Sequence, residues 1–117
     1  MMIEEPMLEQ GEVLIKHSRA NIQRGLESVG GKLYLTNRRL IFLNHKINIE
    51  KGESQIPLAE ISSIDLCWTK FLNRIPVFPN SLLVRTKAGE ELKFVLPNRK
   101  AWKSEINRIL NENSMPV

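Results

Sequence analysis

The clearest alternation of apolar and polar positions lies between residues 30 and 44, in the stretch GGKLYLTNRRLIFLN. Leu33 and Leu35 alternate with lysine and tyrosine neighbours, which is the period of a half-buried strand. A second apolar run, from residue 40 to 43, is rich in strand-favouring types. Asn37 suits a tight turn between the two runs because asparagine tolerates a positive φ angle. The stretch therefore predicts a β-hairpin.

Two registers of this hairpin are open. A two-residue loop gathers four large apolar side chains on one face, because it pairs Leu35 with Leu40 and Leu33 with Phe42. A three-residue loop would instead bring residues 41 and 43 opposite the first strand. A slip of one residue exchanges the two faces of a strand, so only one register can be right. We favour the first one.

The rest of the chain predicts more strands and then one helix. Alternating apolar residues indicate strands near residues 13–24, 55–58, 61–69, 82–86 and 92–96, with a third-strand extension toward residue 49 and loops at 25–30 and 70–80. After Pro97 the period changes, with Asn98 as a candidate N-cap and an apolar face at helical spacing that contains Trp102 and Ile106. We expect a mainly β fold, a bent barrel or sandwich of about seven antiparallel strands capped by one C-terminal α-helix.

Length and composition fit one globular domain. The chain has 117 residues, of which 42% are hydrophobic and 26% charged. We expect a lead-in at residues 1–10, a single domain at 11–113 and a tail at 114–117. No apolar run reaches the length of a transmembrane helix, the N-terminus lacks the pattern of a signal peptide, and Cys67 has no cysteine to pair with. These features predict a cytoplasmic protein, with peripheral membrane attachment left open.

The positive charge is unevenly distributed. The formal net charge is +4, but four glutamates lie within the first 12 residues, so the chain from Val13 onward carries +8. A basic body favours anionic partners such as membrane surfaces, nucleic acid or acidic proteins. A merely soluble surface is the simpler interpretation.

The segment GGKLYLTNRRLIF resembles the signature hairpin of GRAM domains, a branch of the pleckstrin-homology-like (PH-like) superfamily. The strand opening at Gly11-Glu12-Val13, the segment QIPLAEI and the ending ELKFVLPNRKAWKSEINRI follow in suitable order. The similarity covers the chain from about residue 11 to residue 110. It implies a seven-stranded, strongly bent sheet closed by a C-terminal helix, and a module that binds phosphoinositides, other lipids or proteins.

Lipid-binding relatives carry clustered basic residues at the loop between the first two strands. Here that loop, in RGLESVGG, offers one arginine beside a glutamate, which argues against a specific phosphoinositide pocket. By the family topology, a diffuse basic rim would form a candidate site for anionic lipid, made of Arg24, Lys46, Lys51 and Lys87.

Two further surfaces are candidate docking sites. The connection KFLNRIPVFPN joins apolar residues to basic flanks and could dip into a membrane or contact a partner through Lys70, Phe71, Leu72, Arg74 and Phe78. The same residues could instead cover the lower end of the barrel. The second is a hairpin patch that comprises Tyr34, Arg38, Arg39 and Ile41. Its two arginines could meet phosphates or acidic partners, or simply belong to a solvated turn. Tyr34 and Ile41 could support dimerisation if exposed.

Enzyme chemistry finds little support in the sequence. Two histidines and one cysteine show no metal-ligand spacing, and no glycine loop for phosphate occurs. We expect no cofactor, no metal and no small-molecule substrate. Nucleic acid is disfavoured because no aromatic residues interleave with basic ones across neighbouring strands. The sequence predicts a non-catalytic adaptor that docks to a protein or to itself, with weak binding to anionic membrane lipids as the alternative.

Overall fold

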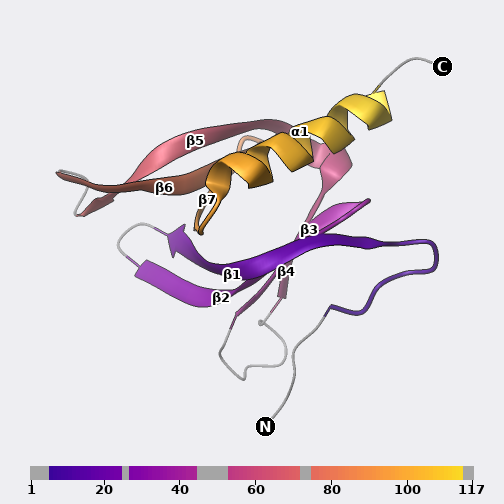
Figure 1. The fold of residues 1–117 in the computed structure, drawn as a ribbon, viewed down its shortest axis with the longest axis horizontal. Helices are drawn as coiled ribbons and strands as arrows, with labels where there is room; N and C mark the ends of the chain where they lie inside the picture. The colour runs from indigo at the N-terminus through magenta and orange to yellow at the C-terminus, as the bar shows by residue number, and fades with distance from the viewer. Residues whose placement is uncertain (1–5, 25–26, 45–52, 72–74, 115–117) are drawn as a thin grey trace, which may run out of the picture.

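The computed structural model describes the backbone of residues 6–24, 27–44, 53–71 and 75–114, and the side chains of residues 6–23, 28–44, 54–67 and 81–112. Figure 1 shows strands followed by one long helix. The elements in chain order are β1 (Leu14–Arg24), β2 (Glu27–Thr36), β3 (Arg39–Asn44), β4 (Glu53–Pro57), the 3-10 helix η1 (Leu58–Glu60), β5 (Ile61–Phe71), β6 (Ile75–Thr86), β7 (Glu91–Val95) and α1 (Arg99–Ser114).

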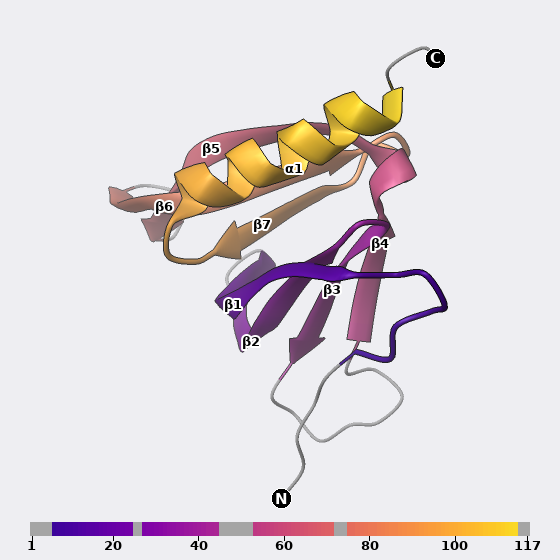
Figure 2. The ribbon, with the colours of Figure 1, turned by 45° about the vertical axis from the view of Figure 1, so that its right-hand side comes forward.

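The seven strands form one antiparallel sheet in the order β4-β3-β2-β1-β7-β6-β5. Strand β1 joins the two halves of the sheet, β4-β3-β2 and β7-β6-β5, because it pairs with β2 on one side and with β7 on the other. Figure 2 shows the sheet bending at this junction, with α1 running along the β5–β7 half. The helix packs on β5 and β6. The predicted mainly β fold with one C-terminal helix is confirmed.

The hairpin adopts the register that we favoured. Leu33 pairs with Phe42 and Leu35 with Leu40, and all four side chains lie in the main core. Strands β2 and β3 approach so closely that a Cβ atom on Gly31 would lie 2.1 Å from the carbonyl oxygen of Leu43. Only glycine fits there without a backbone shift.

The helix closes the core as its apolar spacing predicts. Trp102, Ile106 and Ile109 are buried in the same cluster as the hairpin residues. The carbonyl oxygen of Asn98 accepts a hydrogen bond from the Trp102 amide (3.1 Å), and Asn98 has a φ of 56°, which asparagine tolerates. The ammonium of Lys16 lies 5.8 Å from the centre of the Trp102 ring, which ties β1 to the helix.

Two loop predictions are wrong in extent. Strand β2 begins at Glu27, so the predicted loop at 25–30 is mostly strand. The predicted connection at 70–80 consists largely of the ends of β5 and β6, in which Phe71 pairs with Ile75 and Thr69 with Phe78. Prolines and β-bulges in this segment interrupt the alternation of apolar and polar residues, so the sequence pattern did not indicate strands there. The predicted extension of the third strand beyond Asn44 lies outside the described residues.

Candidate functional site

The two apolar residues of the hairpin patch do not form a free surface. The side chains of Tyr34 and Ile41 are buried, at 3% and 0% exposure, although they point away from the main core. Pro6 and Leu8 line a small hollow with Tyr34, so the N-terminal segment lies against this outer face. The prediction of an exposed Tyr34–Ile41 pair is therefore wrong, because the sequence pattern does not show that a preceding segment folds back on the strand.

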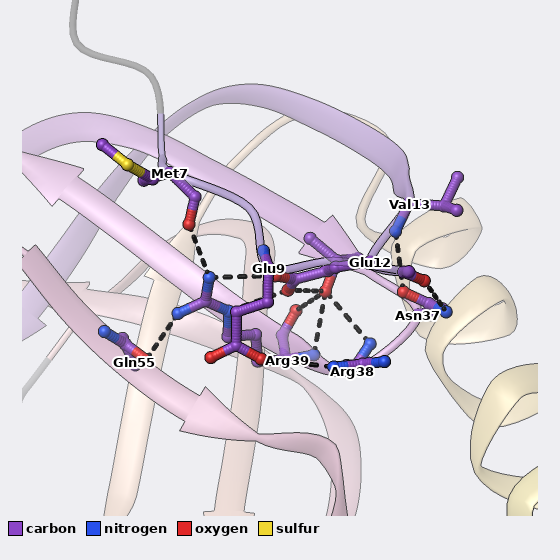
Figure 3. Close-up of polar contacts among 10 residues, drawn as sticks. Met7, Glu9, Glu12, Val13, Asn37, Arg38, Arg39 and Gln55 are labelled. Carbon is purple, nitrogen blue, oxygen red and sulfur yellow. Dashed lines mark hydrogen bonds and ion pairs between the residues drawn. The ribbon is translucent and has the colours of Figure 1, made fainter.

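The two arginines of the patch hold that segment in place (Figure 3). The Arg39 guanidinium donates two hydrogen bonds to the Glu12 carboxylate, of 2.7 and 3.0 Å, in a fork geometry. It also donates to the Gln55 side chain (2.7 Å) and to the carbonyl oxygen of Met7 (2.9 Å). Arg39 thus joins β3, β4 and the N-terminal segment.

Glu12 is the centre of this cluster. Its side chain has 0% exposure, and its carboxylate also accepts hydrogen bonds from the Thr36 hydroxyl (2.6 Å) and the Glu9 amide (2.9 Å). Hydrogen bonding to Arg39 outweighs the cost of burial, so the pKa of Glu12 falls from 4.5 to about 2. We call the Glu12–Arg39–Thr36 cluster the latch.

Asn37 and Arg38 extend the latch at the hairpin turn. The Asn37 side-chain oxygen accepts from the Val13 amide (2.9 Å), and Arg38 pairs with Glu9 at 3.2 Å in a solvent-exposed geometry. These groups bind one another and neighbouring parts of the chain, so the latch is a structural device. It is not an open anion site.

A cleft of about 490 Å³ lies at the start of β5. Its apolar lining comes from Leu58, Ile61 and Leu110, and its polar lining includes Asn107 on α1 and Lys87 after β6. We call it the β5–α1 cleft. Strand β5 is the last in the sheet order, so one of its backbone edges has no strand neighbour within the described ranges of the chain. The arrangement offers an apolar floor beside a sheet edge.

The predicted lipid rim stays a prediction, because the side chains of three of its four residues lie outside the described set. Lys87 is exposed and lies at the β5–α1 cleft. Arg24 ends β1, but its side chain is outside the described set, as are Lys46 and Lys51. The docking residues of 70–80 also lie outside it: Phe71 ends β5 and Phe78 belongs to β6, and both roles stay predictions.

The described residues offer no cluster of three or more histidine, cysteine or acidic groups that could hold a metal ion. Burial raises the pKa of the Cys67 thiol, which disfavours a reactive thiolate. Asp65 accepts a 2.7 Å hydrogen bond from Arg85, within a surface ion-pair network. In the same part of the chain, no helix is long and apolar enough to span a bilayer.

Sequence reasoning missed both the latch and the cleft. The signal for the latch was a glutamate just before the first strand combined with two arginines at the hairpin turn. Nothing in the strand pattern indicated which of the two arginines would pair with this glutamate. The cleft depends on where the C-terminal turns of α1 meet η1, which is a tertiary property that spacing does not give.

Comparisons with known proteins place this fold. A model of the GRAM domain family matches residues 2–101. A comparison with curated proteins finds no match. Among solved structures, the C-terminal domain of an unknown protein from Leishmania infantum is 19% identical, with 86% of this chain and 87% of that chain covered and a TM-score of 0.67.

Two PH domains are similarly close. The Vps36 N-terminal PH domain is 18% identical, with 93% of this chain and 86% of that chain covered and a TM-score of 0.69. The N-terminal PH domain of human ARAP2 is 15% identical, with coverages of 87% and 84% and a TM-score of 0.66. At such identities the likeness shows the fold alone, which is PH-like.

Proposed function

Because the chain belongs to the GRAM domain family, whose PH-like members are generally binding modules for proteins or lipids, we propose that it is a non-catalytic protein-docking module. We propose the β5–α1 cleft as its docking site, with an extended segment of a partner protein as the ligand. The single observation that carries this proposal is the coincidence of the cleft with an edge strand. We also propose that it acts in the cytoplasm.

The edge of β5 supports an extended ligand. A strand with one unpaired edge presents amide and carbonyl groups that can pair with an added strand. The first residues of β5, from Ile61 to Ser63, line the cleft directly. A segment lying there would gain backbone hydrogen bonds and side-chain contacts together.

The lining supports a mostly neutral ligand with one apolar anchor. Leu58 and Ile61 are buried at 2% and 5% exposure, while Leu110 is partly buried against the core. They form an apolar floor on which one large side chain could pack. Lys87 is the cation of the lining, so it would favour a carboxylate at one end of the ligand.

The test fills the cleft without disturbing the core. Ala59 is exposed and lines the cleft, so Ala59→Trp should occupy it. Ala101 is exposed on α1 and does not line the cleft, so Ala101→Trp is the matched control. Peptides selected from a random displayed library against the wild-type protein should lose binding to Ala59→Trp at least tenfold and keep it with Ala101→Trp. Equal binding to all three proteins would contradict the proposed site.

The segment at 70–80 remains a second proposed docking surface, including for self-association. Phe71→Asp or Phe78→Asp should abolish such docking while the fold stays intact. Sedimentation velocity would detect a dimer, and circular dichroism would detect unfolding. If either variant unfolds, these residues belong to the core and the proposed surface is wrong.

Weak association with anionic membrane lipids is the alternative function. Its support is the charge of +8 after residue 12 and the exposed Lys87. Charge-driven binding fades as salt rises, since exposed charges are screened within about 10 Å at 0.1 M salt. Flotation with anionic vesicles should then show binding at low salt that is lost near physiological salt. No flotation at either salt would refute this alternative.

A further inference from the structure

Two cations oppose each other on the outer face of β1 and β2. Arg19 and Lys32 are directly paired in the strand register, and both side chains are exposed. Like charges directly opposite in a sheet repel each other. Neither has an ion-pair partner among the side chains that the structure describes, so the pair is a local excess of positive charge.

The nearest acidic groups of the N-terminal segment are already engaged. Glu12 is buried in the latch with Arg39, and Glu9 pairs with Arg38. These two glutamates offset the positive charge of the arginines at the hairpin turn. They do not offset the charge of Arg19 and Lys32. Among the described side chains no acidic group offsets this pair, and an anion supplied by a partner would relieve the repulsion.

A hollow of about 110 Å³ adjoins this pair, lined by Pro6, Leu8, Leu14, His17, Lys32 and Tyr34. Its volume is well below the roughly 300 Å³ at which small-molecule sites begin, so it suits a single side chain. Leu8 and Leu14 are exposed at 37% and 40%, with Met7 (86%) and Val13 (58%) next to them in sequence. These are the exposed large hydrophobic residues among the described side chains.

We propose that this outer face is a second binding surface, which takes an acidic protein segment bearing one apolar side chain. The apolar side chain enters the hollow beside Leu8 and Leu14, and flanking carboxylates pair with Lys32 and Arg19. The recess favours an inserted side chain over a bilayer, because a flat membrane surface would meet only its rim. This surface is independent of the β5–α1 cleft, so either site can fail without the other.

The probe is a fluorescein-labelled peptide, Glu-Glu-Leu-Glu-Glu, titrated with the full chain and followed by fluorescence anisotropy. Lys32→Gln should weaken its binding about fivefold, the effect of losing one rim ion pair. Lys100→Gln, which removes an exposed lysine from α1, is the charge-matched control and should change binding less than twofold. A peptide with serine in place of leucine should bind more weakly to the wild-type protein.

Folding does not confound this test. Removing one of two opposed like charges relieves repulsion, so the Tm of Lys32→Gln should equal or exceed that of the wild-type protein. Equal weakening by Lys32→Gln and Lys100→Gln would overturn the proposal, because binding would then reflect net charge alone. A second result would also overturn it. This is that the wild-type protein binds vesicles containing phosphatidylserine but not the peptide, and that Lys32→Gln weakens the vesicle binding.

Discussion

The latch provides a stability prediction that can be worked from the structure. Glu12→Gln keeps the shape of the side chain but removes the charge that Arg39 binds in a fork. The folded-state pKa of Glu12 is about 2, against 4.5 ordinarily. At about 1.4 kcal/mol per pKa unit, the folded state gains ~3 kcal/mol from the ionised carboxylate. The Glu12 side chain has 0% exposure and Arg39 has 11%, so solvent screening removes little of this.

The sign of the pH dependence follows from the lowered pKa. Because the folded pKa lies below the unfolded one, Glu12 contributes its stability above pH 4.5 and loses it as the pH falls toward 2. At pH 7 we expect Glu12→Gln to lower the free energy of unfolding by ~3 kcal/mol. At pH 3 the carboxylate of the wild-type protein takes up a proton when the protein unfolds. The difference in the free energy of unfolding between the wild-type protein and Glu12→Gln should therefore be less than half as large as at pH 7.

Urea denaturation at pH 7 and at pH 3, followed by tryptophan fluorescence, measures the difference in the free energy of unfolding between the wild-type protein and Glu12→Gln at each pH. Glu9→Gln is the matched control, because Glu9 forms an exposed ion pair with the neighbouring Arg38 and should cost less than about 1 kcal/mol. A difference for Glu12→Gln that is the same at both pH values would refute the reasoning, since the loss would then come from packing and not from charge.

Three further predictions test the core and the sheet by urea denaturation at pH 7. Gly31→Ala should cost about 3 kcal/mol or more, because the added methyl would meet the backbone of Leu43 at 2.1 Å; a loss below 1 kcal/mol would contradict the close approach. Trp102→Ala should cost ~3–5 kcal/mol, since the side chain is 1% exposed in the core; a smaller loss would mean that α1 closes the core weakly. Lys32→Glu should stabilise the fold by ~0.2–1 kcal/mol, because it places a carboxylate opposite Arg19; destabilisation would show that Lys32 has a structural role.

The fold was largely predictable because its signals are local. Alternation at residues 33–35 and 40–43 located the hairpin but left two registers open, because either loop length places four apolar side chains on one face; the structure adopts the two-residue loop that we favoured. Helical spacing likewise identified Trp102 and Ile106 as the buried face of α1. Where local signals conflicted, as in the proline-bearing segment at 70–80, the strand ends were predicted too short.

The candidate surfaces were much less predictable because exposure is a tertiary property. Tyr34 and Ile41 were expected on the outer face, and they do point away from the main core. They are nevertheless buried, and the N-terminal segment that the latch holds lies beside Tyr34. Topology alone assigned Lys87 to a lipid rim, which stays a prediction, and it could not show that Lys87 also lines a cleft with residues of α1.

The central claim is that the β5–α1 cleft binds a partner segment, and amide chemical-shift mapping tests it most directly. A peptide selected from the library would be titrated into ¹⁵N-labelled protein. We predict that the largest shift changes fall on residues that line the cleft, namely Ile61, Ser62, Ser63, Lys87, Asn107, Leu110 and Asn111. Changes confined to β1 and β2, with none at the cleft, would contradict the claim.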